Sequence, residues 1–234
     1  MLILAFETSA KAASVALMDG TKLLGESYQN TGLTHSQTLM VMAEDVLKQC
    51  GKSARDVEAV AVAEGPGSFT GVRIGVAAAK GYAWGKEIPC YGVSTLEAMA
   101  AQLGAWQGYV CSVMDARRSQ VYHALFHVEC GKCTRIRDDR AVSLQDLGAE
   151  LQNLTEPVFL VGDGSNLCYN TLSESVPSLV LPQEHRMHQR ASGVALAARE
   201  MILRGEPADA AALTPNYLRL SQAERERMEK EQQK

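Results

Sequence analysis

The side chains with the widest chemical repertoire gather in one short stretch of the sequence. His123 and His127 precede Cys130 and Cys133, and imidazole and thiolate groups are the ligands that zinc prefers. The stretch has the pattern of a strand and a hairpin turn, and four residues of a strand span about 13 Å, which is too far for the two histidines to share one ion. Cys130 and Cys133 could still reach one ion together with His127. We interpret all four as simple exposed hairpin residues, and a zinc site remains the alternative.

The other histidines do not form a recognisable catalytic group. His35 precedes a predicted helix and could act as an acid or a base, whereas His185 and His188 lie in a polar loop. None of the three has a serine or cysteine nucleophile at motif spacing. We interpret them as surface or capping residues, and the sequence predicts no catalytic residue.

A glycine-rich turn offers a different chemistry, the binding of an anion. Gly65 and Gly67 allow a positive φ, and Ser68 can cap the helix that follows. The free amides at the start of that helix could hold a phosphate or a carboxylate. A tight strand-to-helix turn without a ligand is the alternative, and the turn lacks the Gly-Lys-Ser/Thr pattern of a Walker loop.

These residues must be positioned by a chain whose two halves have the same order of elements, βββαβαβα. In the first half, strands are expected at residues 2–6, 13–18, 22–27, 57–63 and 90–93, and helices at about 34–50, 68–85 and 94–103. In the second half, strands are expected at residues 109–114, 120–129, 134–137, 158–161 and 179–181, and helices at about 143–151, 165–173 and 191–204.

A three-stranded meander followed by alternating helices and strands is the order of a ribonuclease-H-like lobe. Two such lobes in tandem indicate an α/β protein of the actin, Hsp70 and sugar-kinase architecture. A single doubly wound sheet is the alternative, and the Asp19-Gly20 hairpin signal disfavours it because parallel neighbours need long crossovers. We expect an N-terminal lobe at residues 1–104, a C-terminal lobe at 105–190, a closing helix and return segment at 191–220, and a disordered polar tail at 221–234.

In actin-like folds an aspartate usually ends the first strand and helps to hold a metal–nucleotide complex. Here Glu7 takes that place, and its longer side chain argues against inherited ATP chemistry. Together with Ser9, Gly65, Gly67 and Ser68, it forms the candidate anion- or nucleotide-binding set.

The composition limits the classes of partner. The chain has 234 residues, of which 46% are hydrophobic and 21% charged, with a net charge of −4. This balance is typical of a globular protein and argues against a wide nucleic-acid-binding surface, which requires clustered Lys and Arg. The apolar start is too short for a signal peptide, and no stretch has the length of a membrane span. We therefore expect a cytoplasmic protein without membrane contact, whose six cysteines are reduced.

The most specific motif is the eleven-residue stretch GPGSFTGVRIG, from Gly65 to Gly75. Shorter motifs follow the same family pattern in order, at residues 5–9, 35–36, 92–96, 115–117, 121–122, 162–164 and 215–219. Together they resemble the family of TsaB (also called YeaZ) and its paralogue TsaD, of the bacterial tRNA threonylcarbamoyladenosine machinery. The resemblance implies the two-lobed fold, a stable pairing with TsaD and an ATPase partner called TsaE.

The same resemblance argues against catalysis. In TsaD, two histidines on one helix face bind the catalytic metal, and the matching positions here hold Thr95 and Met99. A hydroxyl and a thioether cannot replace two imidazoles as ligands of such a metal. The resemblance therefore implies a non-catalytic subunit that has no metal and no cofactor and meets tRNA only through the complex.

The resemblance also implies that the first two helices meet the equivalent pair of TsaD in a four-helix packing. Glycines inside a helix cost about 1 kcal/mol each, so two of them in the second helix indicate the close approach of another backbone. Packing on the chain's own sheet is the alternative, and whether the isolated chain forms homodimers stays open. The candidate contacts are Leu39, Met40, Ala43, Val46 and Leu47 on the first helix and Gly71, Gly75, Ala78 and Tyr82 on the second.

Two functions are compatible with these features. The favoured one is a structural partner of TsaD for threonylcarbamoyl transfer to the adenosine beside the anticodon of tRNA. The alternative is a stand-alone actin-fold ATPase or sugar kinase. The short turn Gly162-Asp163-Gly164 is the feature against the alternative, because a working phosphate clamp usually shows a longer Gly/Thr-rich turn there.

Overall fold

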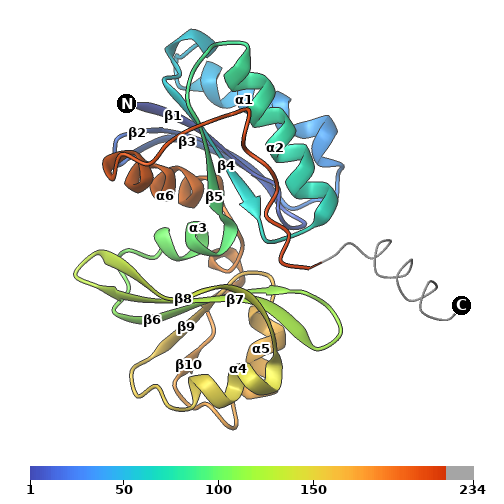
Figure 1. The fold of residues 1–234 in the computed structure, drawn as a ribbon, viewed down its shortest axis with the longest axis vertical. Coiled ribbons are helices and arrows are strands. Elements are labelled where there is room, and N and C mark those ends of the chain that lie inside the picture. Colours follow the sequence, from blue (N-terminus) through green and yellow to red (C-terminus); the bar gives the residue numbers. More distant parts are fainter. Residues whose placement is uncertain (220–234) are drawn as a thin grey trace, which may run out of the picture.

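Two lobes stacked along the long axis make up the molecule in a computed structural model that describes residues 1–219 (Figure 1). The predicted polar tail at residues 221–234 lies outside the described residues, as does Leu220 at the end of the predicted return segment.

The N-terminal lobe is built on a five-stranded sheet with the order β3-β2-β1-β4-β5. Strands β1 and β2 pair antiparallel from Leu2↔Asp19 to Glu7↔Ser14, and β4 lies parallel to β1 on its other side. The elements are β1 (Leu2–Glu7), β2 (Ala13–Asp19), β3 (Lys22–Gln29), α1 (His35–Gln49), a 3-10 turn (Ala54–Asp56), β4 (Ala59–Gly65), α2 (Phe69–Trp84), β5 (Cys90–Ser94) and α3 (Thr95–Ala101).

The second sheet has the order β10-β9-β6-β7-β8, which is the first order read from the opposite end. This equivalence confirms the predicted two-lobed fold. Strand β8 is longer than the predicted 134–137, because it pairs with β7 along almost its whole length. The elements are β6 (Gly108–Asp115), β7 (Gln120–Glu129), β8 (Lys132–Ser143), α4 (Leu144–Leu151), β9 (Val158–Val161), α5 (Ser165–Leu172), β10 (Leu179–Val180), a 3-10 turn (Glu184–Arg186) and α6 (Ala191–Leu203).

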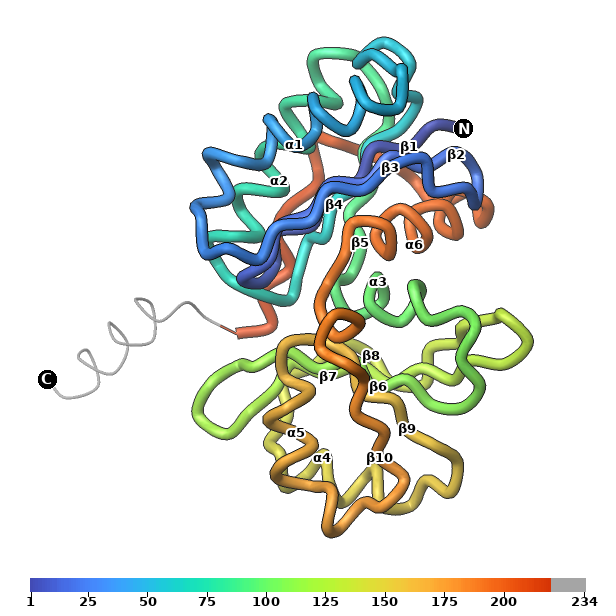
Figure 2. Tube along the Cα trace, turned by 180° about the vertical axis from the view of Figure 1, so that it is seen from behind, coloured from blue at the N-terminus to red at the C-terminus, as the bar shows by residue number. Residues whose placement is uncertain are grey.

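Helices cover both faces of each sheet, which is why the central strands are continuous apolar runs. Alternate residues of β1 point to opposite faces: Leu4 and Phe6 pack with the outer helices α1 and α2, whereas Ile3 and Ala5 pack with α6. In the second lobe, α4 and α5 cover the outer face. The inner helices α3 and α6 lie side by side between the two sheets (Figures 1 and 2).

The inner helices tie the lobes together. Helix α3 follows the last strand of the first sheet, yet Leu96 and Met99 pack into the core of the second lobe. Helix α6 follows the second sheet, yet its alanines pack on β1, β2 and β4. The two helices are in close contact at Gly193, where an added Cβ would collide with the carbonyl oxygen of Ala98.

The segment after α6 returns along α2 and ends between the lobes (Figure 1). Lys80 donates hydrogen bonds to the carbonyl oxygens of Ala211 and Leu213, and the amide of Asn216 donates to that of Glu64 at 2.7 Å. Nη1 of Arg219 then donates to a carbonyl oxygen of the second lobe, that of Ala116. No helix among residues 1–219 combines the length and apolarity that a membrane span requires.

Candidate functional site

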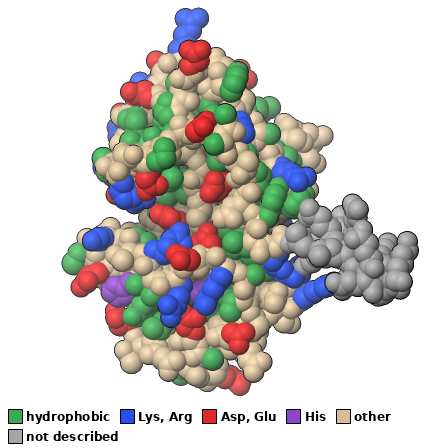
Figure 3. Space-filling view, in the orientation of Figure 1, with side chains coloured by type: hydrophobic (Ala, Val, Ile, Leu, Met, Phe, Trp, Pro, Cys, Tyr) green, Lys and Arg blue, Asp and Glu red, His purple; other side chains and the backbone are tan. Residues whose placement is uncertain are grey.

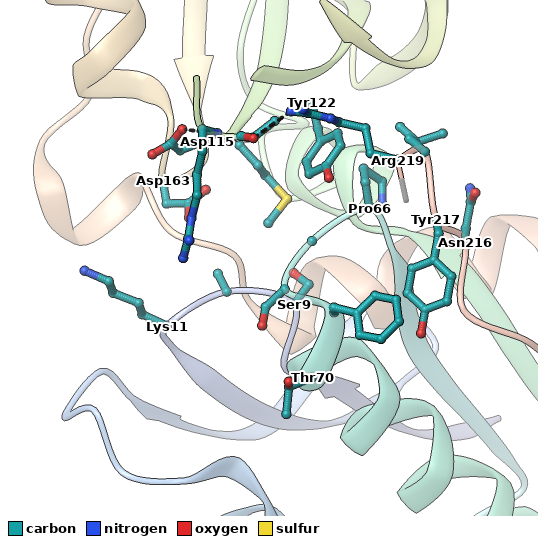
Figure 4. A pocket seen from close by; sticks show the side chains of 18 residues that line it. Ser9, Lys11, Pro66, Thr70, Asp115, Tyr122, Asp163, Asn216, Tyr217 and Arg219 are labelled. Atoms are coloured by element: carbon teal, nitrogen blue, oxygen red, sulfur yellow. Dashed lines mark hydrogen bonds between the residues drawn. The ribbon is translucent and has the colours of Figure 1, made fainter. Parts of the chain in front are cut away.

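A cavity of about 630 Å³ lies where the two lobes and the return segment meet. Figure 4 shows the start of α2 on one side and the ends of β6 and β9 on the other, with the return segment closing a third side. The lining residues are Ser9, Ala10, Lys11, Pro66, Gly67, Ser68, Phe69, Thr70, Met114, Asp115, Ala116, Arg117, Tyr122, Asp163, Asn216, Tyr217, Leu218 and Arg219.

The glycine-rich turn shapes the first-lobe wall. Gly65 has a φ of +118°, and a Cβ there would lie 2.5 Å from the carbonyl oxygen of Asn216. Gly67 has no positive φ and is needed for another reason, because its Cβ would lie 2.5 Å from the carbonyl oxygen of Ser9. The predicted cap is confirmed: the Ser68 hydroxyl accepts a hydrogen bond from the Gly71 amide at 3.3 Å.

Glu7 and Ser9 lie behind this wall and are buried. Oε1 of Glu7 accepts a hydrogen bond from the Ser9 amide at 2.6 Å, while Oε2 has no partner among the described residues. Burial raises the pKa of Glu7 to about 7, against the opposing effect of the hydrogen bonds from Ser9. The Ser9 hydroxyl has no partner within ordinary hydrogen-bond distance among the described residues, but it lies close enough to Glu7 to lower the pKa of that carboxyl, and Ser9 lines the cavity.

The second-lobe wall carries two carboxylates, Asp115 at the end of β6 and Asp163 after β9 (Figure 4). Oδ1 of Asp115 accepts a hydrogen bond from the Arg117 amide at 2.7 Å, and Oδ1 of Asp163 accepts one from Nε2 of Gln189 at 3.3 Å. Desolvation in the cleft raises the pKa of Asp163. The sequence interpretation missed both carboxylates as site residues, although each stands in one of the family motifs.

The β6–β7 turn presents basic side chains at this wall. Three consecutive residues, Arg117, Arg118 and Ser119, have a positive φ between 56° and 62°, a region that non-glycine residues rarely adopt. Arg117 lines the cavity, as does Lys11 from the β1–β2 turn of the other lobe. The cavity therefore contains both signs of charge, with carboxylates from the second lobe and cations from both lobes.

The zinc candidates do not gather. The prediction that they are exposed hairpin residues is wrong for His123, which is buried in the core with Nδ1 at 3.5 Å from Sγ of Cys111. Burial lowers the pKa of His123 to about 4. His127 pairs with Glu156 at 3.1 Å, Cys130 is exposed, and Cys133 is half-buried. Within residues 1–219 no three His, Cys, Asp or Glu side chains are placed to share a metal ion.

The remaining candidates for chemistry are dispersed. His35 makes a ring-nitrogen hydrogen bond with the carbonyl oxygen of Ala10 at 2.9 Å, so it links the start of α1 to the β1–β2 turn. His185 is exposed, in the loop before α6. Thr95 and Met99, which the resemblance matched to two metal-binding histidines, are both fully buried. Met99 fills the space beside Gly162, because a Cβ added to Gly162 would lie 3.0 Å from Sδ of Met99.

Most of the predicted partner contacts on α1 serve the lobe's own core. Leu39, Ala43 and Val46 are buried against the sheet. Leu47 is also buried and packs in the same core. Met40 is 45% exposed and lies on the outer surface, next to Val41, which the sequence interpretation missed and which is 58% exposed.

The glycines singled out on α2 face inward. A Cβ on Gly71 would collide with the carbonyl oxygen of Thr8, and one on Gly75 would collide with the Thr8 hydroxyl. The close approach predicted from these glycines is therefore made by the chain's own β1–β2 turn. Ala78 and Tyr82 are half-buried, and the Tyr82 ring contacts Phe6 edge-on at 6.4 Å between centroids.

The outer side of α2 carries a stripe that the sequence interpretation missed. Ala77, Gly81 and Trp84 are exposed at steps of four and three, which is the helical repeat. Trp84 is 73% exposed, and no atom lies within 4 Å of a Cβ added to Gly81. The helical spacing that grouped Gly71 with Gly75 could also have grouped Ala77, Gly81 and Trp84. It would have done so if the side with Gly71 and Gly75 had been interpreted as the side that packs on the sheet.

Comparison with known proteins gives consistent matches. A family model described as "TsaD: tRNA N6-adenosine threonylcarbamoyltransferase" matches residues 29–227. The chain is 33% identical over 225 residues to the "tRNA threonylcarbamoyladenosine biosynthesis protein TsaB" of Bacillus subtilis, a match that covers 96% of each chain.

Solved structures agree with both the fold and the sequence match. The structure of "YeaZ from Pseudomonas aeruginosa" superposes with a TM-score of 0.76 at 25% identity, covering 92% of this chain and all of that one. A ROK hexokinase from Thermus thermophilus superposes with a TM-score of 0.52 at 12% identity, covering 86% of this chain and all of that one. At that identity the likeness shows the fold alone, and it confirms the predicted sugar-kinase architecture.

Proposed function

The chain belongs to the TsaB (YeaZ) family and has a role in tRNA threonylcarbamoyladenosine biosynthesis, and from this premise we propose that it acts there as a non-catalytic partner of TsaD. The proposed contact is the outer surface of α1 and α2, which we call the α1–α2 face. It comprises Met40, Val41, Ala77, Gly81 and Trp84.

The observation that carries the proposal is Gly81. A glycine inside a helix costs about 1 kcal/mol relative to alanine, and small residues usually offset this cost by letting another backbone approach. Gly71 and Gly75 allow the close approach of Thr8 from the same chain, whereas Gly81 faces open space among the described residues. A second chain packed on this side would explain why a glycine stands at position 81.

The neighbouring side chains suit such a contact. Trp84, Val41 and Met40 are large apolar groups with 73%, 58% and 45% exposure, and they belong to helices that touch each other. Tryptophan is enriched among the residues that dominate binding energy at interfaces, and methionine adapts to a foreign surface. The face therefore offers apolar anchors beside a site where backbones can come close, and this supports helix-on-helix packing with TsaD.

The proposed absence of catalysis rests on the interior of the chain. Thr95 and Met99 are packed in the core, Met99 against Gly162, so neither helps to form an open metal chamber. Glu7 is buried with a pKa of about 7, and a buried carboxyl of this kind is a poor anionic ligand at neutral pH. We assign catalysis to TsaD, ATP hydrolysis to TsaE, and contact with tRNA to the assembly, because this chain's net charge of −4 favours no direct grip on RNA.

The test compares pairs of substitutions in a binding assay with TsaD. Gly81→Arg and Met40→Asp are expected to leave the chain folded and to weaken pairing by a hundredfold or more, on the order expected for a disrupted interface centre. The same two substitutions should break any homodimer that uses this face. Sedimentation with TsaD measures the pairing, and circular dichroism of each variant verifies the fold.

Two matched controls lie on other surfaces. Gly104 also has room for a Cβ, with no atom closer than 3.9 Å, and Leu167 on α5 is 37% exposed. Gly104→Arg and Leu167→Asp should pair like the wild type. Folded Gly81→Arg and Met40→Asp variants that still bind TsaD at wild-type affinity would place the interface elsewhere. Gly75→Arg is unsuitable as a test, because it would displace Thr8 and disturb the fold itself.

A further inference from the structure

The exposed side of α2 that carries Ala77, Gly81 and Trp84 continues toward the start of the helix. Arg73 stands four residues before Ala77, Thr70 stands three residues before Arg73, and both are exposed. Steps of three and four keep residues on one side of a helix, so Arg73 adjoins the α1–α2 face. Figure 3 shows basic and hydrophobic side chains next to each other over the start of α2, on the right side of the N-terminal lobe.

Two aromatic rings hold the Arg73 side chain in one orientation. Its Cζ lies 3.8 Å from the centroid of the Phe69 ring and 5.7 Å from that of the Tyr217 ring, and the two rings stack on each other at 4.4 Å. Nε of Arg73 donates a hydrogen bond to the Tyr217 hydroxyl at 2.7 Å. A long side chain that is already ordered loses less conformational entropy when a partner binds it.

The rest of the Arg73 guanidinium is unused within the chain. Nη1 and Nη2 donate no hydrogen bond to an acceptor among the described residues. Their N–H groups form a planar fork that a carboxylate matches with parallel hydrogen bonds. A guanidinium covered by a partner without an acceptor would destabilise the complex, so a chain that packs over Arg73 has to supply one.

We propose that Arg73 is a specificity-determining contact for TsaD and that Nη1 and Nη2 pair with an aspartate or glutamate side chain of TsaD. The inference rests on the proposed function, because it takes TsaD as the chain that packs on the α1–α2 face. Arginine is enriched among the residues that dominate binding energy at interfaces. Tyr217 is a positioning residue, which binds Nε and leaves Nη1 and Nη2 for the partner.

This arrangement makes the return segment part of partner recognition. Tyr217 stands 144 positions after Arg73 and lies beside the start of α2 (Figure 4). Lys80 holds the same segment along α2 through the carbonyl oxygens of Ala211 and Leu213. Because the segment follows the second lobe in the chain, the Arg73 contact is complete only after both lobes have folded.

The test measures pairing of the full chain with TsaD by sedimentation, at low and at high salt. Arg73→Gln removes the charge and should weaken pairing at least tenfold at low salt, on the order expected for a lost ion pair at an interface. The dissociation constant of this variant should also depend less on salt, because salt screens the ion pair that the variant lacks. Circular dichroism verifies that the variant is folded.

Tyr217→Phe examines the positioning role, since it keeps the stacked ring and removes the acceptor of Nε. Pairing should weaken by about threefold, the effect of one hydrogen bond between side chains. Added to Arg73→Gln, the same substitution should cause no further loss, because its effect passes through Arg73. Additive losses in the double variant would overturn the role given to Tyr217.

A chemical crosslink identifies the partner group. Arg73→Lys places an amine at this position, and a water-soluble carbodiimide activates carboxylates of TsaD in the complex. The amine attacks the activated carbonyl carbon, an amide bond forms, and the carbodiimide leaves as a urea. Mass spectrometry should find a crosslinked peptide that joins position 73 to an aspartate or glutamate of TsaD.

Arg186→Gln, in the exposed 3-10 turn before α6, is the matched control and should leave pairing and its salt dependence unchanged. Wild-type pairing by a folded Arg73→Gln variant, or the absence of the crosslink from a paired Arg73→Lys variant, would overturn the inference. If Gly81→Arg still abolished pairing, the proposed function would stand without the Arg73 contact. If neither Gly81→Arg nor Arg73→Gln affected pairing, the α1–α2 face itself would be the wrong surface.

Discussion

Glu7 is a buried carboxyl at the end of a central strand, with a hydrogen bond to one oxygen and no hydrogen-bond partner for the other among the described residues. In the folded state the pKa of Glu7 is about 7, whereas in the unfolded chain the carboxyl loses its proton near its ordinary pKa of 4.5. Between these values the folded state binds more protons than the unfolded state, so stability must fall as pH rises through this window.

We predict that Glu7→Gln abolishes this part of the pH dependence. The amide oxygen can still accept the hydrogen bond from the Ser9 amide, while the side chain stays neutral at every pH. Relative to wild type, the variant should gain up to roughly 3 kcal/mol in the free energy of unfolding between about pH 5 and about pH 8. Urea unfolding at the two pH values measures the difference.

Glu44→Gln on the exposed side of α1 serves as the matched control and should show no such gain. A wild-type protein whose stability is constant from about pH 5 to about pH 8 would contradict the assignment of Glu7 as a carboxyl that stays protonated in the folded state.

At the scale of elements, α3 is held by a small ionic network in addition to its apolar face. Arg135 on β8 donates to Glu97 on α3 at 2.7 Å and to Asp139 at 2.5 Å, and the Ser94 hydroxyl at the start of α3 donates to Asp139 at 2.5 Å. The Asp139 side chain is only 11% exposed. The network therefore joins the end of β5 in the first lobe to β8 in the second.

We predict that Asp139→Ala lowers the free energy of unfolding by about 2 kcal/mol, because Arg135 and the Ser94 hydroxyl both lose the carboxylate to which they donate. Local opening of α3 should also become more frequent, so amide hydrogen exchange in α3 should become faster relative to exchange in α4. Chemical denaturation and hydrogen-exchange mass spectrometry provide the two measurements.

An exposed ion pair is the appropriate comparison. Arg204 and Glu206 pair at 2.6 Å with side-chain exposures of 54% and 38%, and Glu206→Ala should change stability by no more than about 0.5 kcal/mol. If Asp139→Ala were equally neutral, the inner helix would be held by its apolar contacts alone.

At the scale of the whole molecule, the exchange of inner helices determines how the lobes depend on each other. The inner face of the first sheet, with Ile3, Ala5 and Ala61, is covered by α6, which the chain supplies only after completing the second lobe. A segment of residues 1–104 would therefore expose a continuous apolar sheet face to water.

We predict that a fragment of residues 1–104 does not unfold cooperatively by itself, whereas the full chain unfolds in one transition. Coincident near- and far-ultraviolet circular dichroism curves test the second statement. A peptide of residues 185–219, which contains α6, should restore a cooperative transition to the fragment, and a scrambled peptide should not. A sharp thermal transition of the fragment alone would show that the predicted N-terminal lobe is an independent domain.

The order of elements was predictable from the sequence, because it depends on local chemistry. Alternation and apolar runs identify strands such as β1 and β9, Asp19-Gly20 indicates the first hairpin turn, and Ser68 is a helix cap wherever its helix packs. Two repeats of the same order were enough to predict two equivalent sheets. The family motifs were visible for a similar reason, since they are contiguous in the chain.

The orientation of each helix was decided only by tertiary structure. Gly75 and Gly81 are indistinguishable by residue type, and only the position of Thr8 makes one of them a packing glycine and leaves the other open to a partner. His123 likewise stands on a strand with polar neighbours, yet its side of the sheet is covered by a core. Burial depends on what packs against a residue, and spacing along the chain does not contain that information.

The cavity depends on tertiary structure most of all. Ser9, Phe69, Asp163 and Arg219 come from segments separated by tens of residues, and each was present in a motif that gave no sign of what the residue would face. The sequence by itself determined the strands that end in these turns. Only the stacking of the lobes, set by α3 and α6 and by the return of the chain along α2, decided that the turns meet around one space.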